Sequence, residues 1–537
     1  MEEERKNLYK SDFSLNEIKE IRELEKLSLR KKKINNFLME KRNIINLNNK
    51  ENNFLLNNEK ENKFELIKNG RILYFLSESI IEKDENKISF YITLIFQFFK
   101  EYETKSFEKN ILLNFTEPNS LSNLLIEITL SSNNIPILYF STLNLVQLTY
   151  YSNKLCDELK NNISLLNHII NKFMTYFSEE NTLLSNLYII IGNLLNNQND
   201  YLLLRKSNCF ISLFKSIKLF NTEDKSNENL SYLENLLWLL KKFLDQNNEK
   251  EINYKENLIE SIPKLIKIIR MFYYSNEVNL LFQLLETIYI LTTYDMKIIE
   301  IIYESGIVSN IYNLFEYLFY ENPEKENPII LDCDCVNECL KIYINIFSIE
   351  DSNILKIYYN NELSLVINKL VYKYRFYKNN DCNIQDSIIN LLFNLACFPE
   401  VITIDNILED EKMLSLIIKY YSKNNIYKTL IFFDNIINLH PTLTEKCIDL
   451  NLFDVIILGL NEEFFGNQKF DILKMEFQIL FRLINLDLNS KNKKIIRNEF
   501  ENRNIKELLE KIVLNEKNKE MNLLFEQFIK IYEEQFK

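Results

Sequence analysis

Apolar residues recur at helical spacing in blocks from about Phe64 onward, and short segments rich in Asn, Lys, Glu and Ser separate the blocks. None of these blocks alternates with the period of two that marks a half-buried strand. Several are apolar on nearly all sides, which is typical of a helix enclosed by other helices. The blocks are residues 184–195, 233–244, 281–294, 387–396 and 430–439. This pattern predicts an all-α fold.

A shorter amphipathic segment precedes many of the apolar blocks, and the pair repeats at roughly 40–50 residues. The shorter segments are residues 209–220, 258–270, 304–315, 362–371 and 450–460. Stacked repeats of this length are typical of armadillo and HEAT proteins. We therefore predict a right-handed α-solenoid of armadillo/HEAT type over residues 64–537. Gly306 is expected at a turn between helices, residues 321–328 in an inserted loop, and residues 45–63 in a flexible linker.

The composition supports a helical protein and argues against other fold classes. Only five glycines and seven prolines occur in 537 residues, whereas hairpin turns and phosphate-binding loops need glycine. No apolar run reaches the ~18 residues of a membrane span. The first ten residues lack the apolar core of a signal peptide, and the eight cysteines are mostly scattered. We expect a soluble, intracellular protein without a membrane partner.

Charge is distributed unevenly along the chain. The net charge is −12, yet the first fifty residues carry +4, so the remainder carries −16. An acidic body would repel the phosphates of nucleic acid and is compatible with a basic peptide partner. A solvated acidic surface with no partner is the alternative interpretation of the charge.

Residue types suited to catalysis are scarce. His168 and His440 are far apart in helical context, and each is interpreted as an ordinary histidine. The cysteines between Cys333 and Cys339 lack a fourth ligand nearby and make a poor zinc site. The acids at 409–411 are consecutive and are interpreted as a solvated segment. Phosphate-loop, dinucleotide-binding and nucleophile-elbow motifs are missing from the sequence. We expect no catalytic site, metal or cofactor.

The most distinctive segment is basic and lies near the N-terminus. Residues 26–44 contain seven Lys or Arg against a single acid, Glu40. Such a helix cannot bury enough apolar surface to fold alone, so it is expected to become ordered on an acidic partner. On charge alone, a solvated charge run or a nucleic-acid tail would explain it equally well.

The order of residues in this segment resembles the importin-β-binding segment of the importin α (karyopherin α) family. The family's pattern, approximately L-R-K-x-K followed downstream by K-R-R-N, has its counterparts in LRKKK and EKRN, although Glu40 stands where the family has a basic residue; its R-x-x-x-F/Y-K start is similar to RKNLYK. The matching residues are Arg5, Tyr9, Lys10, Leu29, Arg30, Lys31, Lys33, Lys41 and Arg42. The resemblance implies that residues 1–44 form an importin-β-binding arm ahead of an armadillo array.

The same resemblance implies a cargo groove. In the family, the third helix of each repeat carries a Trp and, four residues later, an Asn, which bind a lysine-rich localisation signal. The corresponding pairs here are Leu143/Gln147, Ile189/Asn193, Trp238/Lys242, Glu286/Ile290, Lys341/Asn345, Asn390/Asn394 and Ile431/Asn435. The candidate groove residues are therefore Asn193, Trp238, Asn345, Asn394 and Asn435. Lys242 departs from the pattern and would repel a cargo lysine.

The sequence thus predicts a divergent importin α-like adaptor that shuttles between cytoplasm and nucleus, with importin β and basic cargo signals as its partners. One alternative is an armadillo scaffold that does not bind conventional localisation signals. Another is a helical-repeat protein without a transport role, whose basic arm touches membrane or nucleic acid. Loss of several Trp faces would weaken binding of a lysine-rich signal, and the better-kept asparagines place any remaining peptide binding in the C-terminal half.

Overall fold

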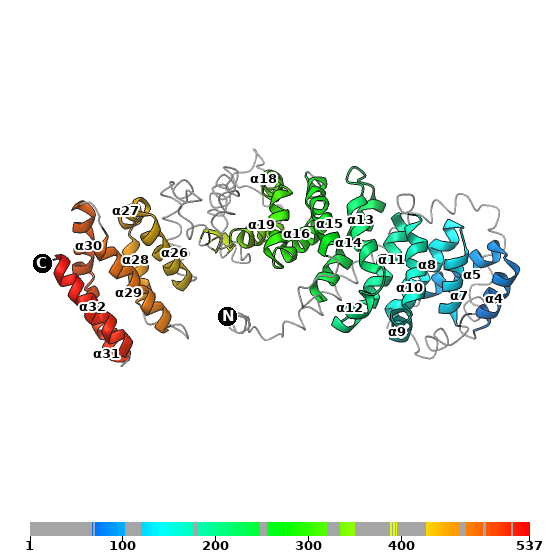
Figure 1. Ribbon diagram of the computed structural model, residues 1–537, viewed down its shortest axis with the longest axis horizontal. Coiled ribbons are helices and arrows are strands. Elements are labelled where there is room, and N and C mark those ends of the chain that lie inside the picture. The colour runs from blue at the N-terminus through cyan, green and yellow to red at the C-terminus, as the bar shows by residue number, and fades with distance from the viewer. Residues whose placement is uncertain are drawn as a thin grey trace. The chain divides into compact units, whose positions relative to one another are not determined.

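The computed structural model describes residues 67, 70–101, 120–176, 181–246, 255–318 except 274 and 276, 333–348, six residues between 387 and 394, 426–460, 469–486, 490–516 and 519–536. Every regular element in these ranges is a helix (Figure 1). The predicted all-α class is therefore confirmed. Residues 1–44 and 45–63, predicted as the basic arm and the linker, lie outside the described residues, as do 321–328 and 362–371.

The chain divides into two compact units, residues 1–124 and 125–537. The described helices of the first unit are α4 (Arg71–Glu82) and α5 (Glu85–Glu101), which pack against each other. Lys83 ends α4 in a left-handed conformation with φ 56°, and its N–H bonds back to α4 carbonyls. This closes a tight turn into α5, with Ile72 and Leu76 buried in α4.

The second unit is built from three-helix repeats. The first helices are α9 (Asn153–Asn161), α12 (Gln198–Leu204), α17 (Met296–Glu304), α27 (Pro441–Asp449) and α30 (Ser490–Asn502). The second helices are α7 (Leu121–Ser131), which crosses the boundary between the units, α10 (Ile163–Met174), α13 (Cys209–Leu219), α15 (Lys255–Ile268) with the 3-10 turn η1 (Ile269–Phe272), α18 (Ile307–Leu318), α28 (Leu452–Gly459) and α31 (Ile505–Glu516). The third helices are α8 (Ile135–Tyr151), α11 (Asn181–Leu194), α14 (Asn227–Gln246), α16 (Val278–Leu291), α19 (Cys333–Ile346), α26 (Ile426–Leu439), α29 (Lys469–Asn485) and α32 (Lys519–Phe536).

Polar residues between the apolar blocks start the helices. The side chains of Asn134, Asn162, Asn197 and Asp295 each accept a hydrogen bond from the backbone N–H three residues later, and Ser152 does the same for α9. Such caps satisfy backbone N–H groups that have no partner within the helix. The abundance of Asn in this chain therefore has a structural use at the repeat boundaries.

The third helices of successive repeats lie side by side. Contacts join α8 to α11, α11 to α14, α14 to α16 and α16 to α19, and in the later repeats α26 to α29 and α29 to α32 (Figure 1). Aromatic side chains fill the space behind them, such as Phe210 and Phe243, whose ring centroids are 4.3 Å apart. Because each repeat buries its apolar faces against its neighbours, the core is continuous along each stack.

The apolar blocks were located well by the periodicity, and the short helices were not. Residues 184–194, 233–244, 281–291 and 430–439 lie in third helices, and 209–219, 258–268, 307–315 and 452–459 lie in second helices. Gly306 forms the expected turn, with φ 82°, between α17 and α18. The first helices are mostly only seven to nine residues long, too short to show a clear period. Among the described residues, no helix is long and apolar enough to span a membrane.

Candidate functional site

The two groups of residues predicted from the sequence have different outcomes. The nine importin-β-binding candidates, from Arg5 to Arg42, all lie outside the described residues. The five groove candidates are described, and each lies on a third helix or, for Asn394, in the short helical stretch that follows α19. The candidate site is therefore the surface of the third helices.

One position of each third helix bonds to the preceding third helix in a recurring way. Asn193, Lys242 and Asn394 each donate to a backbone carbonyl there, namely those of Val146 at 3.4 Å, Gly192 at 2.9 Å and Ile344 at 3.0 Å. Each of these carbonyls belongs to the residue just before the equivalent position of its own helix. The equivalent positions are Gln147, Asn193, Lys242, Ile290, Asn345, Asn394 and Asn435, and we call them the register positions.

A second recurring contact joins a register asparagine to a threonine that lies two residues after the register position of the preceding third helix. Asn193 Nδ2 is 3.0 Å from Thr149 Oγ1, and Asn345 Nδ2 is 2.7 Å from Thr292 Oγ1. Both threonine hydroxyls donate to a carbonyl of their own helix, so each can only accept from the asparagine. The direction of these bonds fixes the orientation of the asparagine amides: Nδ2 faces the neighbouring helix and Oδ1 does not.

The register asparagines are partly exposed. Asn193, Asn345 and Asn394 are intermediate in burial, as is Asn435 on α26. By contrast, Asn186 donates to Thr142 Oγ1 at 3.0 Å in the same manner but is only 5% exposed. The described residues therefore contain two kinds of asparagine link between third helices, one enclosed and one made by a partly exposed side chain.

Trp238 is buried between two third helices. It is 7% exposed, and a Cβ at Gly192 of α11 would overlap its ring. The Lys242 ammonium lies 4.8 Å from the centroid of the ring and donates to the carbonyls of Gly192 and Leu195, the latter at 3.3 Å. The face of the only tryptophan is thus covered by a lysine of the same chain.

Two ion pairs involve the third helices α14, α16 and α19. Lys241 of α14 bonds to Glu286 of α16 at 2.5 Å, and Lys341 bonds to Glu338 within α19 at 2.6 Å. Lys341 also lies 5.4 Å from the ring centroid of Tyr289 on α16. Burial raises the pKa of Glu338, and the bond from Lys341 opposes that rise. Ile290, the register residue of α16, has no side-chain donor. Tyr294, four residues later, instead donates from its Oη to the carbonyl of Leu244 at 2.8 Å.

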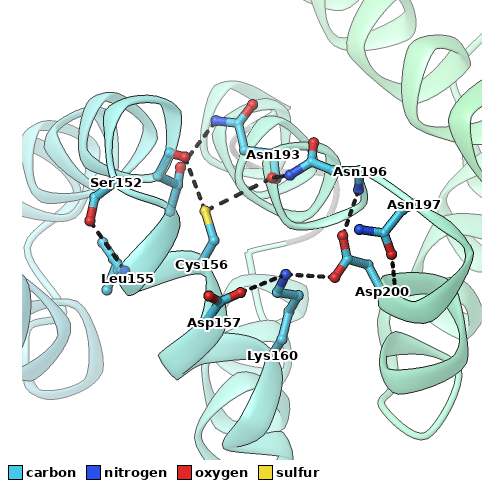
Figure 2. Close-up of polar contacts among 10 residues, drawn as sticks. Ser152, Leu155, Cys156, Asp157, Lys160, Asn193, Asn196, Asn197 and Asp200 are labelled. Carbon is cyan, nitrogen blue, oxygen red and sulfur yellow. Dashed lines mark hydrogen bonds and ion pairs between the residues drawn. The ribbon is translucent and has the colours of Figure 1, made fainter.

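A buried ion pair ties the first helices of two successive repeats together (Figure 2). Lys160 of α9 bonds to Asp200 of α12 at 2.6 Å, and the two side chains are 9% and 7% exposed. The same ammonium lies 2.9 Å from Asp157, whose side chain is 64% exposed. Asp200 Oδ2 also accepts from the N–H of Asn196 at 3.0 Å. This cluster holds the repeats, and with them Asn193, in place.

The described residues offer little for catalysis or metal binding. His168 is exposed and its Nδ1 lies 2.9 Å from the Ser164 carbonyl, whereas His440 is buried. Cys335 and Cys339 are buried in α19, and burial raises the pKa of the Cys339 thiol well above its usual value. No cluster of three metal-ligating side chains occurs in the described part of the chain. The acids at 409–411 lie outside it.

Two features of this surface were missed in the sequence. Gly192 is one of five glycines and interrupts an apolar helix, and this in itself signals close packing against another helix. Lys242 follows Trp238 by four residues, a spacing that places both side chains on one helix face. That spacing could have predicted their stacking, in place of the simple repulsion that we expected from the charge.

Comparison with known proteins identifies the fold and no closer relationship. No family model matches the chain, and no curated protein matches it. Among solved structures, the chain is similar to a β-catenin structure from work on a phosphorylation switch in the interaction between cadherin and β-catenin, with TM-score 0.54, 14% identity, and coverage of 78% of this chain and 70% of that one. It is also similar to an engineered protein, with TM-score 0.52, 11% identity, and coverage of 86% and 98%.

The three-helix repeats agree with the likeness to the β-catenin structure. A designed armadillo repeat protein is also similar, with TM-score 0.36, 14% identity, and coverage of 51% of this chain and 99% of that chain. The fold is an all-α solenoid of armadillo/HEAT type, as predicted.

Proposed function

We propose that this armadillo-type solenoid is a transport adaptor that holds an extended peptide on its third helices and couples to importin β through residues 5–44. The observation that carries the peptide-binding part is the shared orientation of Asn193, Asn345 and Asn394. Each side-chain amide nitrogen donates to a group of the preceding repeat: Thr149, Thr292 or the Ile344 carbonyl. This leaves Oδ1 as an acceptor on a partly exposed side chain.

The spacing of these acceptors suits an extended peptide. Packed helices lie about 8–10 Å apart, and an extended chain rises about 3.3 Å per residue. Successive register positions therefore correspond to about three peptide residues. Asn345 and Asn394 occupy consecutive register positions, whereas Lys242 and Ile290 interrupt the series after Asn193. We therefore assign the peptide to the half of the molecule that contains Asn345 and Asn394.

The net charge of the body favours a basic peptide. Residues beyond the first fifty carry −16, so a lysine-rich segment would be attracted at long range, and more strongly at low salt. The similar β-catenin structure comes from work on its interaction with cadherin, and in this proposal the present chain likewise takes a protein partner. The adaptor in this proposal carries out no reaction.

The coupling to importin β rests on the sequence pattern of residues 5–44. Arg30, Lys31 and Lys33 stand in the order of the importin-β-binding segment, and the segment precedes an armadillo-type solenoid as in importin α. In this proposal the chain shuttles between cytoplasm and nucleus with its cargo.

Peptide binding can be tested by fluorescence anisotropy with a labelled lysine-rich twelve-residue peptide, a length of about four register steps. The Asn345→Ala/Asn394→Ala variant loses two hydrogen bonds of about 0.5–1.5 kcal/mol each, so its Kd should rise at least about fivefold. Asn186→Ala is the matched control, because it breaks the same kind of link between helices at a buried position. It should leave Kd within about twofold.

Two results would contradict this proposal. The first is the absence of saturable binding to the wild-type chain at low salt. The second is an equal loss of affinity in the Asn186→Ala control, because the asparagines would then act only through the stability of the stack.

A further inference from the structure

The Lys242 ammonium has the surroundings of a bound alkylammonium ion. It donates to the carbonyls of Gly192 and Leu195 at 2.9 and 3.3 Å and lies 4.8 Å from the Trp238 ring centroid. Gly192 lies in the last turn of α11 and Leu195 directly follows the helix, at the end where the helix dipole is negative and carbonyls lack partners within the helix. The ring contributes the attraction between a cation and an aromatic face.

The local packing preserves this arrangement. Gly192 has no side chain, so the Trp238 ring can lie against the backbone of α11, where a Cβ would overlap it. The same close approach brings the Gly192 carbonyl within reach of the ammonium. Because Trp238 is 7% exposed, the cation acts on a ring that is largely shielded from water. Ring, glycine and carbonyls together form a site for one primary ammonium group.

We propose that Trp238 and the C-terminal end of α11 form an alkylammonium-binding site that Lys242 fills in the intact chain, so that Lys242 excludes the lysine side chain of a bound peptide from this position. The peptide half of this inference rests on the proposed function; the site itself does not. Lys242 is thus a specificity-determining residue, because a tethered ammonium competes at a high effective concentration with any ammonium from solution.

A second lysine of the chain follows the same principle. Lys341 lies 5.4 Å from the ring centroid of Tyr289 on the preceding third helix, and Glu338 holds its ammonium at 2.6 Å. Two aromatic faces on the third helices are therefore covered by lysines of the chain itself. A lysine-rich peptide would have to displace these side chains, whereas the Oδ1 acceptors of Asn345 and Asn394 belong to partly exposed side chains.

Lys242→Asn is the most informative variant. Asparagine stands at the register positions 193, 345 and 394, so Asn at 242 can keep a bond to α11 while it removes the ammonium. Trp238 is the only tryptophan, so its fluorescence reports this site alone. Titration of Lys242→Asn with n-butylammonium chloride should give a saturable change in emission, measured against sodium chloride at equal ionic strength. The wild-type chain should give none.

Lys241→Ala is the matched control, because it removes the neighbouring lysine, which bonds to Glu286 and not to the tryptophan site. It should behave like the wild type. The inference is overturned if Lys242→Asn retains its helix content and shows no saturable response, or if the wild-type chain responds with the same midpoint. Lys242→Ala is a second variant that lacks the ammonium. Loss of helix content in both variants would mean that Lys242 only stabilises the packing of the helices, and this would also overturn the inference.

The peptide arm separates this inference from the proposed function. Lys242→Asn should bind the lysine-rich peptide at least about tenfold more tightly than the wild type, and a peptide with serine in place of lysine should show no gain. If n-butylammonium binds to Lys242→Asn but no variant binds any peptide, the alkylammonium site stands and the proposed function fails. If peptide binds to the wild type while n-butylammonium fails with Lys242→Asn, the proposed function stands and this inference fails.

Discussion

The ion pair between Lys160 and Asp200 offers a sharp test of how the repeats are joined. The two side chains are 9% and 7% exposed and 2.6 Å apart, whereas Asp157, on the other side of the same ammonium, is 64% exposed (Figure 2). Replacing Lys160 by Met removes one partner of a buried pair and leaves the Asp200 carboxylate buried without its cation. Such a loss costs about 3–5 kcal/mol.

The remaining contacts of Asp200 set the expected value within that range. Its Oδ2 keeps the hydrogen bond from the Asn196 N–H at 3.0 Å, so the carboxylate is not stripped of every partner. We therefore expect Lys160→Met to destabilise the chain by about 3 kcal/mol. Asp157→Asn removes only the exposed carboxylate and should cost less than about 1 kcal/mol. The Lys160→Met/Asp200→Leu variant should recover most of the loss, because no buried charge remains.

Urea unfolding followed by far-ultraviolet circular dichroism measures these differences as shifts in the midpoint. Trp238 fluorescence adds a local probe, since the tryptophan lies in the repeat that contains α12. The reasoning would be refuted if Lys160→Met lowered the midpoint no further than Asp157→Asn. Equal shifts would mean that the buried and exposed carboxylates contribute alike.

Two further substitutions test buried contacts elsewhere. Burial alone raises the pKa of Glu476 on α29 well above its usual value, and its carboxyl has no hydrogen-bond partner among the described residues. Above about pH 4.3 the unfolded chain therefore binds fewer protons at this residue than the folded chain does. The free energy of unfolding should fall as pH rises toward the folded-state pKa. Glu476→Gln should abolish this decline, which the unfolding midpoints of both proteins at about pH 5 and about pH 8 would reveal; an equal change in midpoint in both proteins would count against it. Gly192→Ala should destabilise by about 1–3 kcal/mol through overlap with the Trp238 ring, and Trp238→Leu should remove that penalty in a double-mutant cycle, whereas a zero coupling energy would exclude the contact.

Much of the fold could be predicted from the sequence because its strongest signal is hydrophobic periodicity. The block 233–244 gives a long third helix, α14, since it is apolar on nearly all sides and needs neighbours on most of them. The seven-residue helix α12 could not be predicted in the same way, because two turns carry too few apolar positions to define a period. Its start depends on a local cap, Asn197, in a sequence where asparagine is common everywhere.

The sequence predicted the positions of the candidate site residues on the helices better than it predicted their hydrogen-bond partners. Asn193, Asn345 and Asn394 do occupy equivalent positions of different helical units, but their Nδ2 atoms bond to Thr149, Thr292 and the Ile344 carbonyl. These partners lie about 44–53 residues upstream, and nothing in a single sequence pairs them. Lys242 shows the same limit: its charge predicts repulsion, whereas its partners on α11 become apparent only when the helices are packed.

We propose that this chain is an adaptor coupled to importin β, and isothermal titration of the intact chain with importin β is the direct test of this proposal. We expect a saturable complex that weakens as salt is raised. Lys31→Ala/Lys33→Ala should weaken it by at least about tenfold, whereas Lys26→Ala/Lys32→Ala, which removes the same charge outside the matching positions, should weaken it far less. Absence of binding by the wild-type chain, or equal losses in the two variants, would contradict the account.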